Sequence, residues 1–132
     1  MTPQELRKRT EVFARDVRRF ATPLLHRLEA SDIGFQLRRA GSSVAANYRS
    51  AGRARSHREF TARLGVVLDE ADESKFWLEH LVFCELTRPA ETAPLLREAG
   101  ELVAIFSRSV HTAREHGRAI GRSGDRVIGA IR

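Results

Sequence analysis

The sequence predicts an all-α protein that folds as an antiparallel, up-down four-helix bundle. Large apolar residues recur every three or four positions in four separate segments, which is the spacing of one helix face. No segment shows the alternation of apolar and polar residues that is typical of a strand. At 132 residues the chain has the length of one domain and can bury a core. We expect a bundle over residues 1–116, with helices over about 3–22, 31–52, 57–86 and 91–116.

The first two predicted helices have recognisable ends. Thr2-Pro3-Gln4-Glu5 places a capping threonine, a proline and a glutamate where a helix start favours them. Pro23 ends or kinks the first helix because proline cannot donate a backbone hydrogen bond. The second helix is predicted to be capped by Ser31-Asp32 and to stop at Gly52. Small residues dominate its middle, from Ala40 to Ala46, so a neighbouring helix can approach closely.

The third predicted helix begins with the capping box Ser56-x-x-Glu59. One apolar stripe starts at Phe60, and a second stripe lies about 130° around the helix from the first. A helix that is apolar on more than one side is buried on more than one side. The second stripe therefore predicts contact with another copy of the chain, and the candidate residues for that homo-oligomer interface are Val66, Glu73 and Trp77.

The fourth helix is predicted to have Pro94 in its first turn and to end near His116-Gly117. Residues 117–132 are basic and contain further glycines at positions 121, 124 and 129. This composition predicts a frayed, flexible tail after the bundle.

Charge is unevenly distributed along the chain, which has 23 Lys and Arg, 17 Asp and Glu, and a net charge of +6. Residues 1–58 have a net charge of +8, residues 59–116 have −5, and residues 117–132 have +3. This segregation predicts one basic face and one acidic face, whose charges partly cancel within the bundle.

The arginines of the first two helices predict a surface that contacts nucleic-acid phosphates. Few aromatic residues interleave with them, so stacking on single-stranded bases is not indicated. No helix-turn-helix or zinc-finger spacing is present. The alternatives are an ordinary charged surface or a scaffold whose basic face docks an acidic protein. Besides Arg7 and Lys8, the candidate nucleic-acid-binding residues are Arg15, Arg18, Arg19, Arg38, Arg39, Arg49, Arg53, Arg55 and Arg58.

The sequence favours neither a metal site nor catalysis. No glutamate precedes a histidine by three positions, as in the di-iron bundles, and no cofactor is indicated. Asp69, Glu70, Asp72 and Glu73 cluster on the third helix, where crowding would raise the pKa of a general acid. Solvated carboxylates, or partners for the arginines of the second helix, are the simpler interpretation, because no nucleophile or phosphate-binding loop accompanies the cluster.

The only cysteine, Cys84, excludes an internal disulfide and is expected to be buried in an apolar environment. No apolar run is long enough to span a membrane, and the first residues carry no apolar stretch of a signal peptide. A cytoplasmic location is therefore expected.

Three groups of residues also match a known pattern. They are Gln36-Leu37-Arg38-Arg39-Ala40-Gly41-Ser42-Ser43-Val44-Ala45-Ala46-Asn47-Tyr48-Arg49, then Arg53-Ala54-Arg55-Ser56 with Glu59-Phe60, then Glu70-Ala71-Asp72-Glu73-Ser74-x-x-Trp77-Leu78-Glu79. Over about residues 4–116 the chain resembles the bacterial four-helix-bundle proteins named after the intervening sequences of 23S ribosomal RNA genes. The accessory protein of diversity-generating retroelements is a member of this family.

The resemblance implies a homo-oligomer, a pentameric barrel, with no enzymatic activity. For the retroelement member it implies a basic surface that binds nucleic acid and a reverse transcriptase. One position departs from the pattern, because Ser50 stands where the family often has glutamate. A polar contact that depends on that carboxylate is not expected in this chain.

Overall fold

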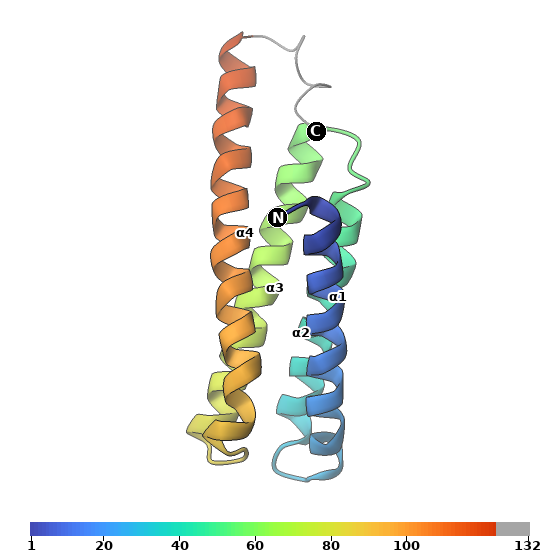
Figure 1. Ribbon diagram of the computed structural model, residues 1–132, viewed down its shortest axis with the longest axis vertical. Coiled ribbons are helices and arrows are strands. Elements are labelled where there is room, and N and C mark those ends of the chain that lie inside the picture. Colours follow the sequence, from blue (N-terminus) through green and yellow to red (C-terminus); the bar gives the residue numbers. More distant parts are fainter. Residues whose placement is uncertain (124–132) are drawn as a thin grey trace.

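Four α-helices follow one another in an up-down arrangement in the computed structural model, which describes residues 1–123 (Figure 1). Consecutive helices pack side by side, whereas the first and fourth helices contact each other less. A short 3-10 helix, Thr22–His26, connects the first two α-helices. The prediction of an all-helical protein is confirmed for the described residues, with α1 at Pro3–Ala21, α2 at Ser31–Ala51, α3 at His57–Phe83 and α4 at Pro89–Ser123.

The capping residues predicted for α1 and α3 form the expected bonds. Thr2 Oγ1 accepts a hydrogen bond from the Glu5 backbone N–H at 3.1 Å, and the Thr2 N–H donates to the Glu5 carboxylate at 2.7 Å. These bonds lower the pKa of Glu5, the Thr2 backbone N–H contributing most. Ser56 Oγ accepts from the Glu59 N–H at 3.0 Å. Both helix starts are thus determined by local hydrogen bonds.

The predicted cap of α2 is wrong. Ser31 is the first residue of the helix, and its hydroxyl donates to the Leu28 carbonyl oxygen. The N-cap position is held by Ala30, which is fully buried and makes no side-chain hydrogen bond. Burial of this alanine in the core takes precedence over capping.

The predicted ends of α3 and α4 also differ from the structure. α3 ends at Phe83, because Glu85 has a φ of 58° and the Leu86 N–H turns back to the Leu81 carbonyl oxygen. α4 begins at Pro89, so Pro94 lies inside the helix rather than in its first turn.

The helix does not stop at Gly117, where the tail was expected to begin. Gly117 packs beside the ring of His57, and α4 continues to Ser123. The last part of the predicted tail, residues 124–132, lies outside the described residues.

The core lies between the four apolar stripes, and each helix contributes two of its most buried large side chains. Burial of such side chains is the main source of stability in a bundle that has no disulfide. These residues are at most 1% exposed: Phe13, Val17, Leu37, Val44, Val67, Leu78, Leu102 and Phe106.

An ion pair joins α1 to α4, the two neighbouring helices that pack least against each other. The Arg9 guanidinium donates two hydrogen bonds of 2.7 Å to the Glu98 carboxylate. Glu101 lies 3.4 Å away from the same guanidinium. These partners raise the pKa of Arg9, which keeps its charge in the folded protein.

The close approach of α1 and α2 depends on Gly41, as the small residues of α2 predicted. A Cβ atom at position 41 would lie 2.7 Å from Val17 Cγ1, and Val17 is itself fully buried. By contrast, a Cβ atom at Gly65 in α3 would meet nothing within 4 Å. Close packing therefore requires glycine at position 41, whereas position 65 has room for a larger side chain.

We expect Gly41→Ala to destabilise the protein, because the clash with Val17 forces the two helices apart at a cost of about 1–3 kcal/mol. The matched change Gly65→Ala should stabilise it by about 0.5–1 kcal/mol, since alanine is the better helix former. Urea unfolding followed by circular dichroism measures both. Equal effects of the two substitutions would contradict the proposed contact.

Candidate functional site

In Figure 1, α1 and α3 begin at the end of the bundle where α2 and α4 finish, and the segments that meet there are rich in basic residues. We define this basic end as residues 3–9, 45–64 and 108–119. These segments contain eleven Lys or Arg residues and three Asp or Glu residues. Antiparallel packing thus concentrates positive charge at one end of the bundle. This concentration is additional to the difference in net charge between residues 1–58 and residues 59–116.

A hollow of about 610 Å³ opens at the basic end between α1, α2 and α3. Three arginines line it, Arg7 from α1 and Arg49 and Arg53 from the end of α2. Arg49 and Arg53 are exposed and form no ion pair with any other residue between positions 1 and 123. The wall also includes two half-buried aromatic rings, Tyr48 and Phe60.

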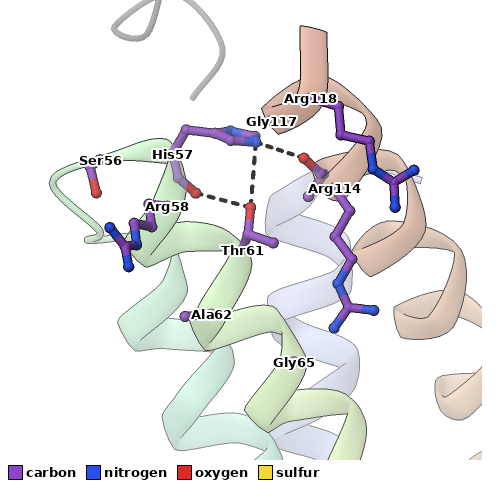
Figure 2. Close-up of a pocket in the computed structure, with 10 residues that line it drawn as sticks. Ser56, His57, Arg58, Thr61, Ala62, Gly65, Arg114, Gly117 and Arg118 are labelled. Carbon is purple, nitrogen blue, oxygen red and sulfur yellow. Dashed lines mark hydrogen bonds between the residues drawn. The ribbon is translucent and has the colours of Figure 1, made fainter. Parts of the chain in front are cut away.

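A second hollow, of about 700 Å³, lies between the start of α3 and the end of α4. Figure 2 shows small residues such as Ala62 and Gly65 along its α3 side. Arg58 comes from α3, and Arg114 and Arg118 come from α4. The last two arginines are new members of the basic surface, because the sequence analysis placed that surface on the first two helices.

His57 joins α3 to α4 at this hollow (Figure 2). Its ring is buried, and Nε2 lies 2.7 Å from the Ala113 carbonyl oxygen, to which it donates a hydrogen bond. The Thr61 hydroxyl donates to the His57 carbonyl oxygen at 3.0 Å. Nδ1 is buried and has no hydrogen-bond partner among the described residues. His57 therefore positions α4 against α3.

The remaining predicted arginines lie apart from these two hollows. Arg18 and Arg38 line a smaller hollow of about 350 Å³ between α1 and α2. Arg15 is exposed and donates to Asp16 at 3.1 Å, and Arg19 is exposed on α1. Arg55 is exposed in the connection between α2 and α3, at the basic end. The structure therefore divides the predicted basic surface into three regions. They are the basic end, the hollow lined by Arg18 and Arg38, and the exposed side of α1 that carries Arg15 and Arg19.

Arg39 is occupied within the bundle. Its guanidinium lies 2.9 Å from Glu70 and 2.7 Å from Glu73, both on α3. Trp77 Nε1 donates to Glu73 at 3.2 Å. The hydrogen bond from Arg39 lowers the pKa of Glu73 below its ordinary value of 4.5, with a smaller contribution from Trp77. Arg39 is thus engaged by two carboxylates of its own chain, and part of the acidic cluster has the ion-pairing role that the sequence suggested.

α3 leaves several apolar side chains exposed, Val66 on the predicted second stripe and Phe76 and Phe83 beside that stripe. Val66 is 43% exposed, Phe76 is 51% exposed and Phe83 is 83% exposed. The ring of His80 is stacked between Phe76 and Phe83, with centroid distances of 5.4 and 6.4 Å. We call this surface the aromatic face, defined as Val66, Phe76, Trp77, His80 and Phe83.

The structure places the side chains of Glu73 and Cys84, in the second half and at the end of α3, differently from what the sequence predicted. Glu73 directs its carboxylate to Arg39 and Trp77 within the same chain. Cys84 is exposed rather than buried, because it caps the C-terminus of α3, three residues after Leu81, the last buried residue of that helix.

The geometry of the described residues brings together no group of three or more His, Cys, Asp or Glu side chains that could hold a metal ion. Over the same part of the chain, no helix is long and apolar enough to cross a membrane.

Sequence reasoning missed Arg114 and Arg118 because they lie far from the dense Arg53–Arg58 stretch in the chain. It also missed the neighbourhood of Tyr48 and Phe60, which helix periodicity assigned to the core. A prediction that four antiparallel helices align their ends would have found both, since α4 then finishes where α3 begins.

The fold and this surface define a small antiparallel four-helix-bundle protein with one strongly basic end. Its sequence matches the model of the 23S rRNA-intervening sequence protein family over residues 4–108. The chain therefore belongs to that family.

A crystal structure of a protein of unknown function from the S23 ribosomal protein family of Bacteroides thetaiotaomicron VPI-5482 has a similar fold. The TM-score is 0.78 at 23% sequence identity, and the match covers 84% of this chain and 99% of the other. At this identity the likeness supports the fold alone. No curated protein matches the chain.

We expect Arg39→Gln to lower the free energy of unfolding at neutral pH by about 0.5–1 kcal/mol, because the ion pair is partly exposed. The folded-state pKa of Glu73 is lowered, so this contribution is complete above about pH 4.5 and is lost as the pH falls through the folded value. The difference in stability between the variant and the unmodified protein should therefore be smaller at acidic pH than at neutral pH.

Urea unfolding at both pH values tests this expectation. Arg15→Gln is the matched control, since it removes an exposed arginine bonded to the adjacent Asp16 and should change stability little. A deficit of Arg39→Gln that persists unchanged at low pH would show that the arginine acts through packing alone.

Proposed function

We propose that this protein is a non-enzymatic, oligomeric nucleic-acid-binding protein that contacts the phosphate backbone through its basic end. The observation that carries the proposal is the convergence of eleven basic and three acidic residues on that end. Arginine is suited to this role because its planar guanidinium donates paired hydrogen bonds to phosphate oxygens. Binding would release counterions from the nucleic acid, which favours association at low salt.

The positive potential of this end comes from side chains rather than from helix dipoles. Two helices begin there and two finish there, so the dipoles of the antiparallel helices largely cancel. The arginines elsewhere are partly neutralised, because Arg15 and Arg39 have carboxylate partners, and at the basic end itself Arg9 is paired with Glu98. The unpaired arginines at positions 49 and 53 are therefore the best candidates for phosphate contacts.

We expect the double substitution Arg49→Glu with Arg53→Glu to weaken nucleic-acid binding by roughly 100-fold or more, because two attractive charges become repulsive. Fluorescence anisotropy with RNA and DNA oligonucleotides at low salt measures the affinity. Binding by the unmodified protein should fall steeply as salt is raised, and the variant should show a shallower dependence.

The control is Arg88→Glu with Arg97→Glu, which changes the net charge equally but lies away from the basic end. This variant should retain most of the affinity. Equal losses in the two variants would show that only net charge matters, and a protein that binds no nucleic acid at low salt would exclude the proposed function.

The alternative function is a scaffold whose basic end docks an acidic protein partner. The retroelement member of the family, which uses its basic surface to bind a reverse transcriptase as well as nucleic acid, is the precedent for such a partner. Capture of a protein after nuclease treatment, lost in the Arg49→Glu and Arg53→Glu variant, would favour this alternative.

The oligomer in this proposal forms through the aromatic face of α3. Exposed apolar side chains are costly in water when they gather on one helix, as the stacked rings of Phe76, His80 and Phe83 do, and such surfaces contact other proteins. The family resemblance makes a pentameric barrel the expected assembly. A ring of copies would repeat the basic end several times around one axis, so that weak phosphate contacts add together.

We expect light scattering to show an oligomer at micromolar concentration and Phe76→Glu to shift it toward the monomer, since a charge in an apolar interface is strongly unfavourable. The control is Phe35→Glu, which changes a similarly exposed phenylalanine on α2. A monomeric unmodified protein, or equal dissociation by both variants, would argue against the aromatic face as the interface.

A further inference from the structure

The hollow between α1, α2 and α3 combines two kinds of side chain that the sequence analysis had kept apart. Arg7, Arg49 and Arg53 supply positive charge, and Tyr48 and Phe60 supply aromatic rings. Few aromatic residues interleave with the arginines in the sequence, but the fold places these two rings beside them. The volume of about 610 Å³ is in the range of pockets that hold a small organic ligand.

Both rings are held rigidly by their surroundings. Tyr48 packs against Phe106 of α4 with ring centroids 5.3 Å apart, and its burial raises the pKa of its phenol, which stays neutral. Phe60 lies in the first turn of α3, which the Ser56 cap fixes in place. Each ring is half-buried, so one part contacts the core and another part lines the hollow.

We infer that this hollow binds an unpaired base of a single-stranded nucleic acid, which stacks on the aromatic rings while the arginines bind its flanking phosphates. The inference rests on the proposed function and specifies its substrate as single-stranded. Aromatic rings stack on any base, whereas the bases of a duplex are already stacked on one another. A wall that carries rings as well as arginines therefore selects for an unpaired nucleotide.

The hollow beside His57 lacks this combination. Its wall consists of small residues and arginines, and its only ring is the buried imidazole of His57, which bonds to Ala113. Tyr48 and Phe60 also line a third hollow at this end, of about 570 Å³, in which Arg108 is the one arginine of the wall. Base stacking is assigned to the hollow that places three arginines beside the two rings.

The test compares oligonucleotides of about 12 nucleotides that have the same phosphates but differ in their bases. RNA and DNA single strands are measured in parallel by anisotropy, each beside an abasic version of equal length. The unmodified protein should bind the abasic strand roughly 5- to 100-fold more weakly, which is the range expected for one stacked base. A 2-aminopurine base should also lose fluorescence on binding.

The substitution Phe60→Leu keeps an apolar side chain but removes the ring. It should abolish most of the difference between base-containing and abasic strands while leaving the salt dependence unchanged, because the phosphate contacts remain. Tyr48→Phe keeps a ring and should retain the difference. Phe35→Leu, at an exposed phenylalanine of α2 outside both this hollow and the aromatic face, is the control for loss of a ring elsewhere, and thermal unfolding verifies that each variant is folded.

The outcomes separate this inference from the proposed function. Equal affinity for the base-containing and abasic strands, with binding still lost in the Arg49→Glu and Arg53→Glu variant, overturns the stacking site and leaves backbone binding intact. If Phe60→Leu does not reduce the difference in affinity between base-containing and abasic strands, the stacking site is also overturned. If no oligonucleotide binds, both the inference and the proposed function fail.

Discussion

The packing of four apolar stripes in antiparallel order determines at which end or side of the bundle the charged side chains of residues 1–119 lie. The side chains of Phe13, Leu37, Leu78 and Phe106, one from each helix, are almost completely removed from water. Because consecutive helices run in opposite directions, residues near position 5, position 50, position 60 and position 115 reach the same end. The contact of Gly41 with Val17 sets how closely the first pair of helices can approach.

Once the core sets this alignment, the charges divide into two groups. Along the sides of the bundle, Arg9 meets Glu98 and Arg39 meets Glu70 and Glu73, so positive and negative residues from different helices satisfy each other. At the basic end there are few carboxylates to pair with the arginines. The same antiparallel order cancels the helix dipoles there, and guanidinium groups alone produce the positive field.

The surface has a second specialised region that is separate in both position and chemistry. The aromatic face on α3 exposes apolar rings, whereas the basic end exposes cations around the half-buried rings of Tyr48 and Phe60. A bundle protein of this size can bind itself through one surface and a polyanion through the other, because each surface uses different helical faces. Oligomerisation through α3 would multiply the basic ends without covering them.

The sequence by itself determined the number of helices, their core residues and the caps at Thr2 and Ser56, because these depend on interactions within a few positions of the chain. It also located the arginines of the Arg53–Arg58 stretch. Four local features were decided by tertiary contacts: Ala30 replaced the expected cap of α2, Pro94 lay inside a helix, Gly117 continued α4, and Cys84 was exposed.

Only the tertiary structure could pair Arg39 with Glu73 and bring Arg7, Tyr48 and Phe60 around one hollow. Helical periodicity reports which side of a helix faces the core, and the predicted antiparallel order indicates which helix ends meet, but neither gives the axial alignment of the helices or the side chains that pair between them. That alignment arises when apolar stripes far apart in the sequence pack together. The positions of the charged and aromatic side chains at the basic end follow from it.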